Sequence, residues 1–278
     1  MNKPSRKISK SKKTSKRSKF FSSAFRRFSA YLFWSLLTVV VAVFMLFIVR
    51  TVIIPRFPLW NKAMHSHVQY PDGTVRGIDI SHYQDEIDWE VLRNARIHGA
   101  PLSFIYVKAT EGTDIIDENF NQNFYNAKKN NILRGAYHFY SPQSSAAEQA
   151  KFFCKIVQLD ESDLPPVLDV EKIGDLSPAQ LCKELKIWLR IVEEHYHIKP
   201  VLYASFKFRQ KYLQTLEFDK NPYWIAHYYV DTLAYKGPWH FWQHTDAGKI
   251  DGVKGYVDIN VFNGTYEDLI NMTIQRED

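Results

Sequence analysis

The segment Pro165-Pro166-Val167-Leu168-Asp169-Val170-Glu171 leads a short apolar run into two carboxylates that lie two positions apart. Residues i and i+2 of a β-strand point to the same face, so Asp169 and Glu171 would project together, with their Cβ atoms roughly 7 Å apart. Two neighbouring carboxylates resist double ionisation, and one pKa rises, which places a proton donor beside an anion at neutral pH. The alternative is that both side chains face solvent at a loop edge, and the pair alone does not distinguish the two.

Short apolar runs and amphipathic stretches alternate through most of the chain, and this pattern favours a parallel sheet. Eight strands within about 200 residues suggest a closed, TIM-barrel-like (β/α) barrel. The last three strands leave little room for helices, so we expect fewer helices than strands and a degenerate or antiparallel end. Ser177 and Pro178 form a good N-cap and first turn. The predicted strands are residues 77–81, 104–108, 135–140, 167–171, 201–205, 223–227, 240–244 and 256–261, and the predicted helices are residues 89–98, 118–130, 146–159 and 178–195.

The net charge of +6 conceals an asymmetry between the two parts of the chain. Residues 1–71 contain 14 Lys or Arg and no Asp or Glu, so the remaining 22 basic and 30 acidic residues give the rest a net charge of −8. The basic character therefore belongs to the N-terminal part and does not indicate nucleic-acid binding. Residues 1–27 are rich in Lys, Arg and Ser without a periodic apolar face, and we expect a disordered cytoplasmic tail.

Residues 28–54 are almost wholly apolar and predict a transmembrane signal anchor in the lipid bilayer. The uncharged stretch 28–49 has the length needed to cross about 30 Å of hydrocarbon as a helix. The preceding basic residues predict a cytoplasmic N-terminus, a single pass and an extracytoplasmic domain, on the periplasmic or cell-wall side. A cleaved signal peptide is the alternative, but its apolar region would be shorter and end at a small-residue site. A linker is expected at residues 55–74.

Acidic and aromatic residues recur at the predicted strand ends, where a barrel of this type carries its site. A chain that is 15% aromatic has many rings for gripping sugars, although most belong to the core. Carboxylates gathered with such rings suggest glycoside hydrolysis, which uses a pair of carboxyl groups. The four acids are Asp79, Asp169, Glu171 and Asp258.

The same oxygen atoms could instead hold a hard metal ion. Four histidines near the strand ends could add nitrogen ligands, namely His82, His138, His227 and His244. None of these four histidines stands in a His-x-His or His-Glu-x-x-His pattern, so we expect no metal and no cofactor. Cys154 and Cys182 lack metal-ligand spacing, and they form either a disulfide or two buried thiols.

The order of these motifs resembles glycoside hydrolase family 25, the Chalaropsis-type lysozymes or N-acetylmuramidases. The resemblance covers about residues 75–265 within an expected catalytic barrel at residues 75–270. Seven motifs in one order make it specific. They are Gly77-Ile78-Asp79-Ile80-Ser81, Lys108-Ala109-Thr110-Glu111-Gly112, Gly135-Ala136-Tyr137-His138-Phe139, Leu168-Asp169-Val170-Glu171, Leu202-Tyr203, Trp224-Ile225-Ala226, and Phe241-Trp242-Gln243 followed by Val257-Asp258-Ile259-Asn260.

The resemblance implies a modified α/β barrel that cleaves the β-1,4 bond from N-acetylmuramic acid to N-acetylglucosamine in peptidoglycan, with retention favoured. Glu171 then matches the general acid/base and Asp169 the residue that stabilises the reacting centre. Asp169 could act as the nucleophile, or it could orient the N-acetyl group of the substrate. Asp79 and Asp258 match the other acids of the cleft, and the implied substrate-binding residues are Tyr137, Phe139, Tyr203, Trp242 and Gln243.

Two other functions remain open from the sequence. The domain could be a membrane-tethered module that binds peptidoglycan without cleaving it, or a scaffold that reuses the fold. The retained carboxylates argue against pure binding, which needs aromatic rings and hydrogen bonds but no acid with a raised pKa. In either case we expect glycan strands as the partner and a monomeric domain.

Overall fold

The computed structural model describes residues 14–50, 73–214 and 216–275, which fall in two units, Met1–Asn61 and Lys62–Asp278. In the first unit, helix α1 spans Thr14–Ile48. The helix thus begins within residues 1–27, for which the sequence analysis expected disorder. Residues 1–13 lie outside the described part.

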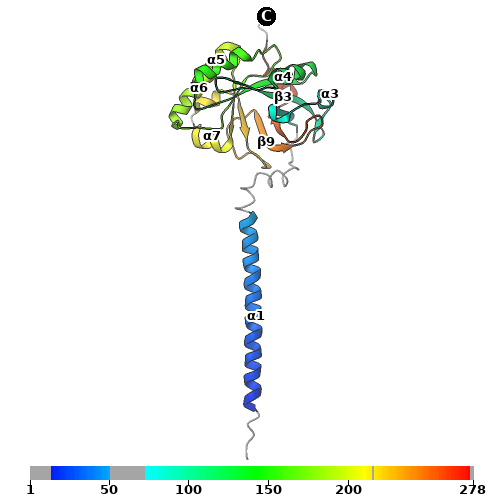
Figure 1. Cartoon of the computed structure of the whole chain (residues 1–278), viewed down its shortest axis with the longest axis vertical. Helices are drawn as coiled ribbons and strands as arrows, with labels where there is room; N and C mark the ends of the chain where they lie inside the picture. The colour runs from blue at the N-terminus through cyan, green and yellow to red at the C-terminus, as the bar shows by residue number, and fades with distance from the viewer. Residues whose placement is uncertain (1–13, 51–72, 215, 276–278) are drawn as a thin grey trace, which may run out of the picture. The chain divides into compact units, whose positions relative to one another are not determined.

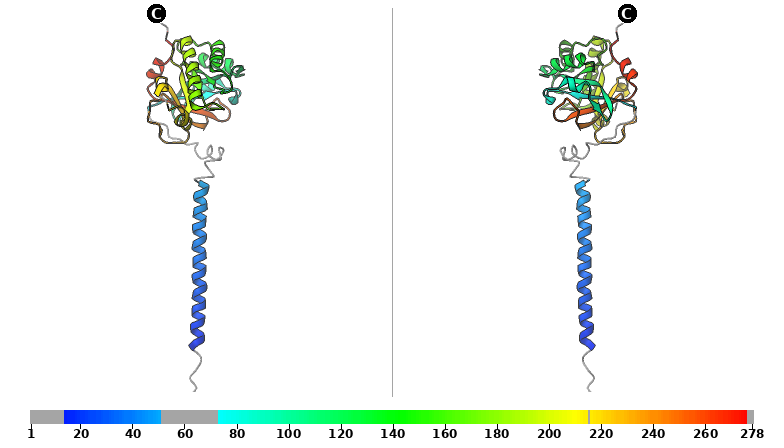
Figure 2. Two further views of the ribbon diagram at one scale, coloured as in Figure 1. Left: turned by 90° about the vertical axis from the view of Figure 1, so that its left-hand side faces the viewer. Right: turned by 90° about the vertical axis from the view of Figure 1, so that its right-hand side faces the viewer.

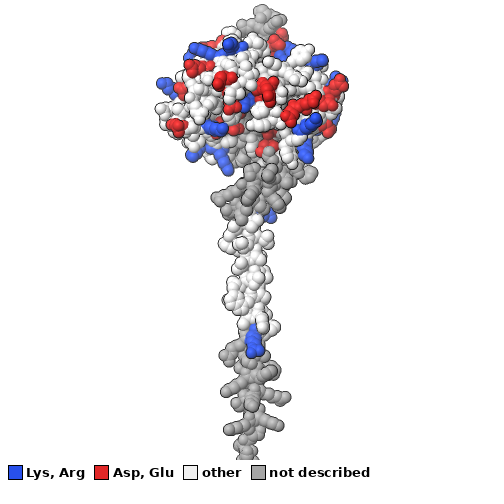
Figure 3. Space-filling model, viewed as in Figure 1, with Lys and Arg blue, Asp and Glu red and all other residues white. Residues whose placement is uncertain are grey.

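Within α1, the stretch Arg27–Ile48 is long and apolar enough to cross a membrane, and none of its most apolar window is buried in the protein. Figure 3 shows this part of the helix almost entirely white, without acidic or basic side chains along most of its length. Residues 51–54 of the expected anchor and residues 55–72 of the expected linker lie outside the described residues.

The second unit is built on an eight-stranded barrel, which confirms the eight strands expected from the sequence. β1 pairs with both β3 and β10, and this double pairing closes the sheet. Two short strands lie off the barrel, β2 (Arg96–Ile97) and β4 (Ile115–Ile116). The barrel strands are β1 (Val75–Ile80), β3 (Ala100–Glu111), β5 (Leu133–Phe139), β6 (Val167–Asp169), β7 (Val201–Ser205), β8 (Tyr223–Ala226), β9 (Phe241–Gly248) and β10 (Val257–Phe262).

β10 runs antiparallel to both of its neighbours, β9 and β1, whereas the other neighbouring strands of the barrel are parallel. This confirms the antiparallel end that the crowded late strands suggested. The register places Asp79 at the end of β1 opposite Asp258 near the start of β10. The reversal therefore brings an early residue of one strand to the rim where the other strands end.

Helices lie around the outside of the barrel strands, as the views in Figures 1 and 2 show. Three of the predicted helices are present, and Ser177 caps one of them by accepting a hydrogen bond from the Gln180 amide. Helix α7, which follows β7 directly, was not predicted. The helices of this unit are α3 (Trp89–Leu92), α4 (Phe120–Lys129), α5 (Ala146–Ile156), α6 (Pro178–Tyr196), α7 (Phe206–Tyr212) and α8 (Tyr266–Asn271), with 3-10 turns at His82–Gln84 and Leu216–Lys220.

The helix predicted at residues 89–98 is wrong beyond Leu92. β2 instead forms a hairpin with the start of β3, where Ile97 pairs with Ala100. The two residues between them, His98 and Gly99, have φ values of 49° and 82°. Positive φ at both central positions is what a type I′ hairpin turn requires, so this turn ends the helical path.

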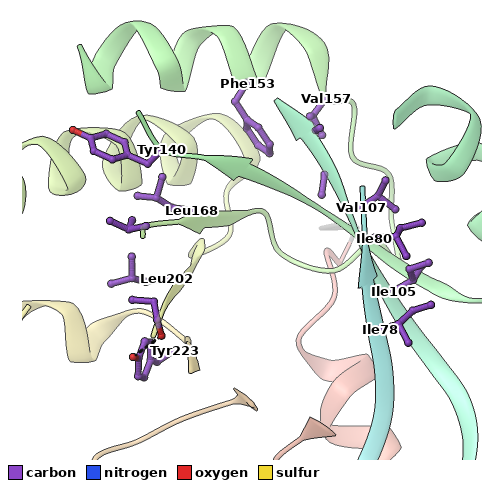
Figure 4. Close-up of a cluster of buried hydrophobic side chains, with 14 of the residues drawn as sticks. Ile78, Ile80, Ile105, Val107, Tyr140, Phe153, Val157, Leu168, Leu202 and Tyr223 are labelled. Carbon is purple, nitrogen blue, oxygen red and sulfur yellow. Dashed lines mark hydrogen bonds between the residues drawn. The ribbon is translucent and has the colours of Figure 1, made fainter. Parts of the chain in front are cut away.

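Successive side chains of each strand alternate between the barrel interior and the helix layer, and this alternation decides which residues reach the site. Figure 4 shows outward-facing Ile78, Ile80, Ile105 and Val107 together with Phe153 of α5. A second cluster fills the interior with aromatic and aliphatic side chains: Val75, Phe104, Tyr106, Leu164, Val167, Val201, Tyr203, Trp224, Ala226, Phe241, Phe262 and Leu269. Gly77 makes room for this filling, because a Cβ there would lie 2.4 Å from the Phe104 ring.

Candidate active site

A cleft of about 390 Å³ opens above the aromatic interior, at the barrel end where β1, β3, β5 and β6 finish. All four predicted acids line it, although they come from three distant parts of the chain. Its lining residues are Asp79, Ser81, Tyr83, Gln84, Lys108, Glu111, Tyr137, Phe139, Asp169, Glu171, Lys172, Tyr203, Trp224, Tyr228, Gln243 and Asp258. The arrangement is therefore an acid-rich groove with aromatic walls.

Of the five predicted substrate-binding residues, four line the cleft, namely Tyr137, Phe139, Tyr203 and Gln243. Trp242 does not, and its prediction is wrong. It is 1% exposed in the outer core, and its indole N–H donates a hydrogen bond to the His227 carbonyl at 2.8 Å. Because Gln243 points into the barrel, the residue before it on β9 must point outward.

The tryptophan of the cleft is Trp224 on β8, and Tyr228 lies just beyond that strand. The alternation of side chains along a strand could have identified both from the sequence, because residues 224, 226 and 228 would point to the same face. Tyr83 also lines the cleft and is 80% exposed. Trp224 stands in a quoted motif but was given no role, and Tyr83 and Tyr228 lie outside the seven motifs.

Asp79 is the centre of a buried hydrogen-bond network and is 6% exposed. Its Oδ2 accepts from Gln243 Nε2 and from Asn260 Nδ2, each at 2.7 Å. The Gln243 Oε1 in turn accepts from the hydroxyls of Tyr203 and Tyr228, each at 2.7 Å. Two side-chain amide groups therefore donate hydrogen bonds to the same oxygen of Asp79.

Burial raises the pKa of Asp79 to about 6, despite the hydrogen bonds from Asn260 and Gln243, which lower it. A hydrogen bond with the Asp258 side chain also lowers this pKa, and the charge of Glu171 raises it. Because two carboxyl groups form a hydrogen bond only when a proton lies between them, Asp79 and Asp258 are arranged to share one.

Asp169 ends β6 and is 8% exposed. Its Oδ1 is buried and has no hydrogen-bond partner among the described residues. Burial raises the pKa of Asp169 well above its usual value, and the charges of Glu171 and Asp79 raise it further. A desolvated carboxyl oxygen without a donor favours the protonated form.

Glu171 lies beyond the end of β6, because the strand expected to reach it stops at Asp169. Its side chain is exposed in the cleft, but the other residues that line the cleft reduce its contact with water. This desolvation raises the pKa of Glu171, and the charges of Lys172 and Lys108 oppose the rise. Both carboxyls of the opening motif therefore have raised pKa values, as the pairing argument predicted for one of them.

The four histidines considered as metal ligands are spread over different surroundings. His138 is buried between the Thr110 hydroxyl and the Gln149 side chain, and burial lowers its pKa to about 4. His82 contacts Asp117, and His227 stacks on Phe206. Among the described residues, no group of three or more His, Cys, Asp or Glu has the arrangement of a metal site. Cys154 and Cys182 are separate, buried free thiols.

Comparison with known proteins places this geometry in a family. A family model described as glycosyl hydrolases family 25 matches residues 78–253. An uncharacterized protein YegX from Escherichia coli O157:H7 is 42% identical over 213 residues, covering 76% of this chain and 77% of the relative. Lysozyme M1 of Streptomyces globisporus is 34% identical over 206 residues, covering 69% of this chain and 68% of that protein.

Among solved structures, a bacterial lysozyme from Streptomyces coelicolor superposes with a TM-score of 0.66 and 32% sequence identity. The superposition covers 73% of this chain and 98% of that structure. The family model, the relatives and the barrel agree with the acid-lined cleft. The chain belongs to glycoside hydrolase family 25 and is a glycoside hydrolase.

Proposed function

We propose that this protein is a membrane-anchored muramidase that hydrolyses the β-1,4 bond between N-acetylmuramic acid and N-acetylglucosamine in peptidoglycan. The observation that carries the proposal is the juxtaposition of Asp169 and Glu171 in one cleft with aromatic walls. A purely binding groove would gain nothing from buried carboxyls with raised pKa values, because burying them costs stability. Described residues of a single chain line the cleft, so a monomer suffices.

Glu171 acts as the general acid and donates its proton to the glycosidic oxygen as the bond breaks. After bond cleavage, the resulting carboxylate accepts a proton from the attacking water, and this step restores the acid for the next cycle. The surrounding carboxylates stabilise the positive charge that develops on the sugar ring.

Asp169 orients the N-acetyl group of the substrate, whose oxygen attacks the anomeric carbon, and the outcome is retention. The buried Oδ1 of Asp169 supports this route, because it has no hydrogen-bond partner among the described residues and can accept the N–H of the acetamido group. Direct attack by Asp169 would also give retention. The remaining acids, Asp79 and Asp258, line the same cleft.

The anchor is the stretch Arg27–Ile48, with the N-terminus in the cytoplasm and the barrel on the cell-wall side. Its length and composition support this placement, together with the basic residues that precede it. Protease added outside intact spheroplasts should remove a tag fused after residue 278 and spare one fused before residue 1. The opposite pattern would exclude this topology.

The activity itself is tested with the full-length chain in detergent micelles and purified peptidoglycan. Products are reduced with borohydride and identified by mass spectrometry. Reduced muramic acid at the new ends supports the proposal, whereas reduced glucosamine would indicate a glucosaminidase. Binding of strands without new reducing ends would indicate a non-catalytic module. The first anomer seen by NMR should be β, and immediate appearance of α would exclude retention.

A further inference from the structure

Two lysines stand in the wall of the cleft beside Glu171. The ammonium groups of Lys108 and Lys172 lie 5.0 Å and 5.4 Å from the centroid of the Phe139 ring. Both lower the pKa of Glu171. A cation beside a proton donor works against holding the proton at neutral pH, so proton donation alone does not explain these lysines.

The two lysines differ in what they contact. Lys108 forms an ion pair with Glu111, with 2.7 Å between Nζ and Oε2, and its side chain is 12% exposed. Lys172 is exposed, and among the described residues it forms no ion pair with a carboxylate. Its contact is the face of Phe139, which holds the ammonium group by a cation–π interaction. Lys172 is therefore the cation that an incoming anionic group can reach.

Resting on the proposed function, we propose that Lys172 determines specificity by binding a carboxylate carried on the lactyl arm of muramic acid. That carboxylate is the terminal group of the lactyl arm itself where the peptide is absent, and a carboxylate of the peptide where one is attached. Both offer the same chemistry to an ammonium group.

Charge in the cleft supports this assignment. Five carboxyl groups line the cleft and would repel an anionic substrate in their ionised forms: Asp79, Glu111, Asp169, Glu171 and Asp258. Lys172 offers local compensation at one wall, and such complementarity mainly gives specificity. The sugar that bears the lactyl arm adjoins the bond at Glu171, and Lys172 is the next residue along the chain. A bound carboxylate would also screen Lys172 from Glu171 and help that acid keep its proton.

The test uses the full-length chain and three forms of peptidoglycan strand. The first carries its peptides, the second has had them removed to free the lactyl carboxylates, and the third is the second after conversion of its carboxylates to methylamides. The measured quantity is kcat/KM on each carboxylate-bearing strand divided by kcat/KM on the amidated strand. Lys172→Gln should lower this ratio about tenfold, as expected for a hydrogen bond between charged groups. Lys172→Arg should restore it.

The comparison of strands distinguishes the two carboxylates that Lys172 could bind. A fall confined to the first strand assigns the peptide carboxylate, and a fall confined to the second assigns the lactyl carboxylate. The alkaline limb of kcat/KM should also move to higher pH in Lys172→Gln, because the pKa of Glu171 rises when the neighbouring cation is removed. A merely structural lysine would not move this limb.

An unchanged ratio in Lys172→Gln would overturn the proposal. Lys254→Gln, which removes an exposed lysine from a different cavity, is the matched control and should keep the ratio of the unaltered protein. Failure of the unaltered protein to release muramic acid ends from any strand would instead overturn the proposed function.

Discussion

The indole N–H of Trp224 donates a hydrogen bond to the side-chain oxygen of Asn260 at 2.8 Å. Because an indole is a donor only, Asn260 must turn its oxygen toward Trp224 and its amino group toward Asp79. The distance from that amino group to Asp79 Oδ2 is 2.7 Å. A buried aromatic residue thus sets the hydrogen bonding of an acid through one intermediate side chain.

Replacing this tryptophan should change the pH dependence of the enzyme. In Trp224→Phe the Asn260 amide is free to rotate, and Asp79 loses a donor that lowers its pKa. If activity requires ionised Asp79, the acid limb of kcat/KM moves to higher pH by up to about 1 unit, which corresponds to about 1.4 kcal/mol. Trp242→Phe removes an indole hydrogen bond outside the cleft and should leave the limb in place. Identical limbs in both variants would contradict this role.

Loss of the proton donor should abolish most of the activity without unfolding the chain. Glu171→Gln keeps the shape of the side chain but cannot transfer a proton. We expect kcat to fall by about 100-fold or more, in line with general acid catalysis. The rate of formation of reducing ends from peptidoglycan measures the effect. Glu86→Gln changes an exposed acid outside this cleft and serves as the control. Near-normal turnover by a folded Glu171→Gln protein would exclude the assignment.

Neutralising Asp79 should make the fold more stable at neutral pH. The pKa of Asp79 is about 6 in the folded chain against an ordinary value of 3.8 in the unfolded chain, so the folded state holds more protons between these values. Stability therefore falls as pH rises through this window, by about 3 kcal/mol in total. In Asp79→Asn, the amide oxygen can accept from Gln243 and Asn260 while its amino group faces Asp258.

This variant should gain up to about 3 kcal/mol in the free energy of unfolding at about pH 7 and gain nothing near pH 3, below the unfolded pKa. Urea unfolding followed by tryptophan fluorescence at both pH values gives the comparison. A gain of equal size at both would point to packing and refute the titration argument. Cleavage of glycan should fall in the same variant, since one of the four carboxyl groups proposed for the cleft is gone.

The outward-facing tryptophan should matter for stability and little for the cleft. Trp242→Ala removes a ring that is 1% exposed and a hydrogen bond to His227. Large-to-small changes of this kind cost about 3–5 kcal/mol. The midpoint of urea unfolding should fall accordingly, while KM for glycan strands in the folded protein stays close to that of the unaltered chain. A raised KM with unchanged stability would mean that this residue contacts substrate after all.

The strands and the acids could be predicted because both leave local signals. An apolar run followed by carboxylates marks a buried strand with a polar end, and Asp79, Asp169 and Glu171 follow this pattern. Their convergence follows from the barrel, since parallel strands end at one rim. Asp258 reaches the same rim through the reversal of β10, which the crowded late strands only suggested.

The errors arose where neighbouring side chains or distant contacts decide the outcome. Trp242 was assigned by motif, although the parity of β9 sends it away from Gln243. The helix predicted through residue 98 ignored the turn at His98 and Gly99, whose positive φ values depend on pairing with β3. The partners of Asp79 could not be predicted either, because Gln243 and Asn260 meet it only after the barrel closes.

The register of β1 with β10 also fixes where the ends of the barrel emerge. Val75, the first residue of β1, pairs with Phe262, the last residue of β10, while the acids Asp79 and Asp258 pair at the opposite extremity. Both exits are therefore a full strand length from the catalytic groups. An immobilising support or a fused module could be joined at either exit without obstructing the mouth of the cleft.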